Sequence, residues 1–167
     1  MSIPMTQFKA LSDRANILFI MRLTFALISL ELGLALVYSY FDISLGSEAD
    51  TWPLALTLVG TIILAPLFET WLCQYLFFKL AGWIGARVQN INVASIFVST
   101  SSLFFAVMHN DSIWFMLYAL FAGIALAYCF LHFFNLYQSL MISFWFTVIL
   151  HALFNSAVLI LDHFMAS

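Results

Sequence analysis

The stretch IWFMLYALFAGIALAYCFLHFF, residues 113–134, decides the fold of this chain. It contains no Asp, Glu, Lys or Arg, and it exceeds the roughly 20 apolar residues that an α-helix needs to cross the hydrocarbon core of a bilayer. The run is continuously apolar and lacks the alternation that is typical of membrane barrel strands. The sequence therefore predicts a transmembrane α-helix here.

Other apolar runs of similar character lie on both sides of this stretch. Short polar connections separate them, so we expect an all-α, polytopic bundle of about five to six helices in one integral membrane domain, residues 1–167. The expected helices cover residues 17–40, 52–80, 93–108, 113–134 and 140–164.

Composition supports a membrane protein and excludes other classes. Of the 167 residues, 65% are hydrophobic and 8% are charged, whereas soluble domains carry about 25% charged residues. A small soluble fold could not hide that much apolar surface, so the lipid bilayer is the expected partner. The net charge of −3 offers no basic face for nucleic acid. Cys73 and Cys129 lie inside apolar runs, which favours buried core residues over a disulfide.

Basic residues predict the orientation of the bundle. Loops rich in Lys and Arg face the cytoplasm, whereas the loop at 42–50 contains neither residue. We therefore expect a cytoplasmic N-terminus in a plasma membrane, namely a bacterial inner membrane. The basic residues that flank the first run or separate the second from the third are Lys9, Arg14, Arg22, Lys79 and Arg87.

Small residues predict where helices touch. Ala119, Gly123 and Ala127 recur every four residues, and such a face lets another helix backbone approach closely.

Ionisable residues within the apolar runs are the candidate functional residues, because an unpaired charge at bilayer depth is costly. Arg22 is close enough to a helix end to extend toward the interface, and His132 fits a packed or interfacial histidine. Glu31 has two open interpretations, namely a structural pair with another helix or a supporting role at a functional site. The remaining ionisable residues are Glu69, His109 and His151. Each of them, taken alone, could also be a polar group satisfied by a neighbouring helix.

Spacing links these candidates to further residues. Asn155 follows His151 by one helical turn, so both side chains share a face, and Phe105 stands in the same relation to His109. We expect the Phe105 ring to pack against His109.

Three segments resemble the CPBP family, which comprises CAAX prenyl proteases and bacteriocin-processing or immunity proteins and is also called Abi. The family pattern is E-E-x-x-x-R, F-x-x-x-H and H-x-x-x-N on successive membrane helices. Here APLFETWLCQ (65–74), FAVMH (105–109) and HALFN (151–155) follow in that order. The resemblance covers about residues 55–160. Thr70 and Gln74 replace the second Glu and the Arg.

The resemblance implies a glutamic-type intramembrane endopeptidase that acts on a protein or peptide presented at the membrane. Glu69 would activate water as a general base, and His109 would share that water and protonate the leaving amine. His151 and Asn155 would form an oxyanion hole. Thr70 and Gln74 would support the site through a neutral hydrogen bond in place of the charged pair.

Other interpretations remain open. No cofactor and no metal ligand is expected, but two His and one Glu also form a ligand set for catalytic zinc. A second alternative is a non-catalytic member of the family that serves bacteriocin immunity or binds a partner. A small transporter is a third alternative, disfavoured because no repeat is present.

The depth of the candidate residues poses a difficulty. If the second helix begins at Trp52, Glu69 lies roughly 25 Å along it, whereas His109 lies near the surface where that helix starts. We therefore expect the first part of the 52–80 run to be a separate short or tilted segment, with the spanning helix starting near Ile62 or Pro66. A wide gap between Glu69 and His109 would reject a shared site.

Overall fold

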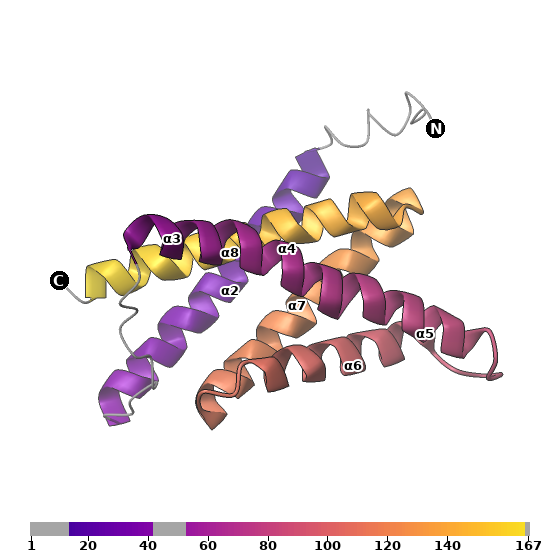
Figure 1. The fold of residues 1–167 in the computed structure, drawn as a ribbon, viewed down its shortest axis with the longest axis horizontal. Helices are drawn as coiled ribbons and strands as arrows, with labels where there is room; N and C mark the ends of the chain where they lie inside the picture. Colours follow the sequence, from indigo (N-terminus) through magenta and orange to yellow (C-terminus); the bar gives the residue numbers. More distant parts are fainter. Residues whose placement is uncertain (1–13, 42–52, 166–167) are drawn as a thin grey trace.

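The computed structural model describes residues 14–41 and 53–165, and these residues form helices without any strand. Figure 1 shows the helices as rods that cross one another obliquely. They are α2 (Arg14–Phe41), a run from Leu54 to Gly85, α6 (Val93–Met108), α7 (Ile113–Tyr137) and α8 (Leu140–Met165). The prediction of an all-α bundle is confirmed.

Three of these helices are long and apolar enough to cross a membrane, and they cover Ala55–Gly85, Ile113–Tyr137 and Leu140–Leu161. Shorter apolar helices cover Asn16–Leu30 and Val93–Met108. Many large apolar side chains are exposed on all of them, as expected where lipid replaces water. The prediction of an integral membrane protein agrees with these spans. Its orientation stays a prediction, and Lys9 and the loop at 42–50 lie outside the described residues.

The second predicted helix is one unbroken rod (Figure 1). The residues at its internal junctions all have right-handed helical backbone angles. The expectation of a separate segment before Ile62 or Pro66 is therefore wrong. Its consecutive parts are α3 (Leu54–Val59), the π-helix η1 (Gly60–Leu64), α4 (Ala65–Glu69), the π-helix η2 (Thr70–Leu76) and α5 (Phe77–Gly85).

Pro66 does not interrupt this rod because the turn before it is widened. Proline in a helix interior clashes with the preceding turn and normally kinks or breaks the helix. Here the N–H of Ala65 bonds the carbonyl of Gly60, five residues earlier, in the π pattern. The resulting helix of 31 residues is about 46 Å long, which exceeds the roughly 30 Å hydrocarbon core, so it must tilt to stay in the membrane.

The hairpin of α5 and α6 removes the difficulty of depth. Glu69 lies as far before the end of α5 at Gly85 as His109 lies after the start of α6 at Val93. The two helices run antiparallel, and Phe78 on α5 packs edge-on against Phe97 on α6 with ring centroids 5.3 Å apart. Glu69 and His109 therefore lie at about the same distance from the turn that joins α5 to α6.

Close packing of α6 on α7 depends on the predicted small residues. Ala119 and Ala127 are buried, and a Cβ added at Gly123 would lie 3.1 Å from the Ser102 Cα. The predicted close contact between helices is confirmed.

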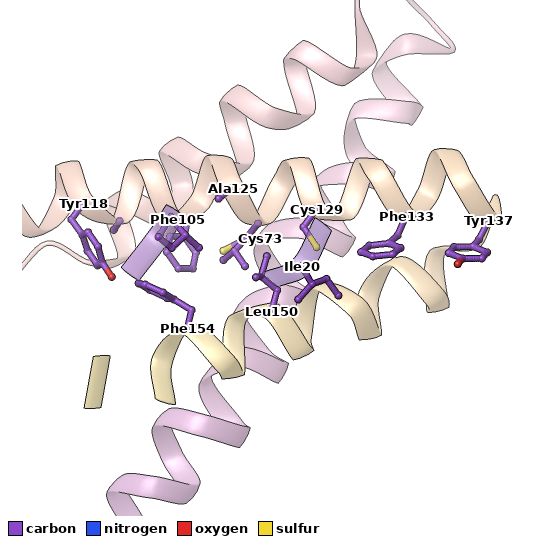
Figure 2. Close-up of a cluster of buried hydrophobic side chains, with 14 residues drawn as sticks. Ile20, Cys73, Phe105, Tyr118, Ala125, Cys129, Phe133, Tyr137, Leu150 and Phe154 are labelled. Carbon is purple, nitrogen blue, oxygen red and sulfur yellow. The ribbon is translucent and has the colours of Figure 1, made fainter. Parts of the chain in front are cut away.

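An apolar core joins α7 to α8. Figure 2 shows buried side chains along both helices, among them Phe133, Leu150 and Phe154, and Phe105 of α6 joins the same cluster. The Phe133 and Phe146 rings stack with centroids 4.0 Å apart. Cys73 and Cys129 are both free and buried, as predicted.

The first helix packs on the far end of α7. The Asn16 amide donates to the Tyr137 hydroxyl at 2.8 Å, and Phe19 stacks on His132 with ring centroids 3.9 Å apart. The prediction that His132 is a packed histidine is confirmed. The side chain of Glu31 lies outside the described part of the chain, so its role stays a prediction.

Candidate active site

Three ionisable side chains from three helices meet at one carboxylate oxygen. Glu69 ends α4, and its Oε2 lies 3.5 Å from the Nε2 of His151 on α8 and 3.9 Å from the Nε2 of His109. The site is partly shielded, since the side chains of Glu69, His109 and His151 are 17%, 24% and 3% exposed. The structure thus brings together the acid and both imidazoles that the sequence singled out.

His109 is held at the point where α6 ends. Its backbone angles are φ −106° and ψ 57°, so the chain leaves the helix there. The ring Nδ1 donates to the Phe105 carbonyl at 2.8 Å, and this satisfies one of the carbonyls that a helix end leaves free. A carbonyl only accepts, so the proton of the neutral ring is on Nδ1 and the lone pair at Nε2 faces Glu69.

Phe105 supports both imidazoles. Its ring centroid lies 4.5 Å from that of His109 and 5.7 Å from that of His151. The contact with His109 agrees with the expectation from their spacing, whereas the contact with His151 was not expected because it joins two helices. One buried aromatic ring therefore fixes the separation of the two imidazoles.

His151 presents the opposite chemistry. Its Nδ1 is buried without a hydrogen-bond partner among the described residues, whereas its Nε2 faces the Glu69 carboxylate. A proton on Nδ1 would be buried without an acceptor, which costs free energy. The neutral ring therefore carries its proton on Nε2 and offers a donor where His109 offers a lone pair.

Asn155 has a different neighbour. It lies one turn beyond His151 on α8, and its amide donates to the backbone carbonyl of Thr61 in η1 at 2.8 Å. The side chain therefore joins α8 to the helix of Glu69 through a backbone group and not through the carboxylate.

Thr70 and Gln74 are fully buried directly after Glu69. Their polar atoms make no hydrogen bond with the described residues, so the neutral hydrogen bond expected between them is not formed. Both residues belong to the π-helix η2, whose backbone hydrogen bonds span five residues. The sequence offered no indication of this widened turn.

The zinc alternative requires at least three ligand side chains around one point. Among the side chains that the structure describes, which leave out Glu31, Asp162 and His163, no group of three His, Cys, Asp or Glu residues has an arrangement that could hold a metal ion. The zinc alternative stays a prediction, tested by chelator treatment of the purified protein.

Sequence reasoning missed two features near the site. The Thr61 carbonyl receives the Asn155 amide, and the sulfur atoms of Cys73 and Met108 lie 4.0 Å apart where η2 meets the end of α6. Pro66 within a span was the available signal for the first, since proline leaves a carbonyl without its helical donor.

Together these features define a helical membrane protein with a half-buried acid and two imidazoles at its centre. A family model described as type II CAAX prenyl endopeptidase Rce1-like matches residues 51–157, which is more than half of the chain and includes all three motifs. The chain belongs to this Rce1-like family, and the family supports a CAAX-type membrane protease. No curated protein and no solved structure matches the chain.

Proposed function

We propose that the chain is a glutamic-type intramembrane endopeptidase that hydrolyses a peptide bond in a protein presented at the membrane. The observation that carries this proposal is the approach of both imidazole Nε2 atoms to one carboxylate oxygen of Glu69. The 3.9 Å between Glu69 and His109 exceeds hydrogen-bond length, and such a gap fits a bridging water.

The tautomers assign complementary roles to the three groups. Glu69, with the lone pair of His109 beside it, takes a proton from water, and the resulting hydroxide attacks the carbonyl carbon of the substrate. The His151 Nε2–H donates to the oxygen that becomes negative. When the carbon–nitrogen bond breaks, the proton taken from water passes through His109 to the leaving amine. No atom beyond water and peptide is required.

The substrate is proposed at the level of class. The family description names a CAAX prenyl endopeptidase, whereas this chain has neutral Thr70 and Gln74 where the motif has Glu and Arg. We therefore propose a membrane-presented protein segment and assign no prenyl group to it.

Glu69→Gln provides the test. The amide has nearly the same shape but cannot act as the base, so protein N-termini that depend on the native chain should disappear from the membrane proteome. His132→Gln is the matched control, because His132 packs on Phe19 away from the site and its loss should leave those termini in place. Identical termini with native protein and Glu69→Gln would refute the peptidase.

A second candidate function is non-catalytic partner binding or bacteriocin immunity, which the loss of the charged pair at Thr70 and Gln74 favours. In that case Glu69→Gln should preserve protection or binding in cells. The same variant therefore separates the two functions.

A further inference from the structure

Pro66 leaves one backbone carbonyl of the long helix without its donor. In η1 the N–H of Ala65 bonds Gly60, five residues earlier. The next bond in this pattern would run from residue 66 to the Thr61 carbonyl, but proline has no N–H. An unsatisfied carbonyl is costly at bilayer depth, because lipid cannot replace the lost donor.

Asn155 supplies the missing donor from another helix. Its Nδ2 donates to the Thr61 oxygen at 2.8 Å, the length of a good hydrogen bond. The two residues are 94 positions apart in the chain, so the bond depends on the packing of α8 against η1. Thr61 and Glu69 share one rod, and Asn155 and His151 share another. The bond therefore ties the helix of the acid to the helix of the imidazole donor.

We infer that Asn155 is a positioning residue that replaces the Pro66 N–H and thereby holds Glu69 against His151. This inference rests on the proposed function of Glu69 and His151. This role is distinct from that of the oxyanion donor that the H-x-x-x-N motif implies, because it uses the N–H of Asn155 that donates to Thr61. The distance that this bond would maintain is the 3.5 Å between Glu69 Oε2 and His151 Nε2.

A double-mutant cycle tests this role, because Pro66→Ala returns a backbone N–H that can itself bond the freed carbonyl. Asn155→Ala should lower the peptide cleavage rate by about 10- to 100-fold, since a misplacement of about 1 Å at a catalytic group has effects of this size. Pro66→Ala alone should stay within a few-fold of the native rate. The combined variant should recover to the rate of Pro66→Ala.

The opposing outcome is equally definite. If the combined variant cleaves as slowly as Asn155→Ala, Asn155 acts on the substrate and the positioning role is wrong. Asn155→Leu adds a matched control, because an apolar side chain of similar size has no donor for the carbonyl and should behave like Asn155→Ala.

A distance measurement separates failure of this inference from failure of the proposed function. Spin labels at introduced cysteines replacing Leu56 on α3 and Ile160 on α8 would report the separation of the two rods, since both positions are exposed and the native cysteines are buried. The distance distribution should broaden or shift in Asn155→Ala and return to the native one in the combined variant. No shift in Asn155→Ala would overturn the inference, whether or not the chain cleaves peptides.

Discussion

Gly123→Ala should destabilise the bundle by wedging α6 away from α7. The added methyl would lie 3.1 Å from the Ser102 Cα, 3.2 Å from the Phe105 Cβ and 3.3 Å from the Phe105 Cδ1. These separations are tighter than ordinary van der Waals contact, which is about 3.5–4.0 Å between carbons, and the nearest atom is backbone that cannot rotate away. Overpacking of this kind costs about 1–3 kcal/mol.

The comparison variant is Gly82→Ala on α5, where an added methyl meets nothing within 4 Å. Alanine also gains about 1 kcal/mol over glycine from helix propensity, and this gain is the same in both variants. The difference in their free energies of unfolding therefore isolates the packing strain, and we expect Gly123→Ala to be less stable than Gly82→Ala by about 1–3 kcal/mol.

Unfolding in mixed detergent micelles, followed by circular dichroism, measures this difference. Because Phe105 contacts both imidazoles, Gly123→Ala should also lower the cleavage rate of the folded fraction. Equal stability of the two variants would refute the argument that α6 and α7 touch through Gly123.

Three further predictions concern the site and its supports. His151→Ala should lower turnover by about 100- to 1000-fold, because it removes a donor to the developing oxyanion, whereas His132→Gln should leave turnover unchanged. Equal rates for these two variants in a peptide cleavage assay would contradict the role of His151 as the oxyanion donor. Asn92→Ala should cost about 1 kcal/mol of stability, since the Asn92 side chain accepts from the Ser95 N–H at the start of α6, and a thermal unfolding midpoint that did not fall would show that this cap is dispensable. Chelator treatment of the purified protein should leave cleavage intact, and a loss restored by zinc would favour the metal mechanism.

Several elements could be predicted from the chain because their cause is local. The start and end of α6 at Val93 and Met108 match the predicted run, since polar residues bound an apolar segment on both sides. The buried state of Cys73 and Cys129 follows in the same way from their apolar neighbours. Such features depend only on the free energy of transferring a segment from water to lipid.

The error over the second helix shows where local reasoning fails. The depth of Glu69 in the long 52–80 run suggested a break near Ile62 or Pro66, but a π-turn accommodates the proline and tilt accommodates the length. Depth was measured from Trp52, whereas the α5–α6 turn sets the level at which Glu69 and His109 meet. The expected neutral bond between Thr70 and Gln74 is also absent, and both residues lie in the π-helix η2, which the sequence did not indicate.

The sequence by itself determined that this chain is a helical membrane protein. It also singled out the acid and the imidazoles, because an ionisable group among apolar residues is too costly without a partner. Only the tertiary structure decided that these groups meet at one oxygen of Glu69, that the two rings carry their protons on different nitrogens, and that the Asn155 amide bonds Thr61. These features depend on helix register, tilt and widened turns, which arise from packing between segments that are distant in the chain.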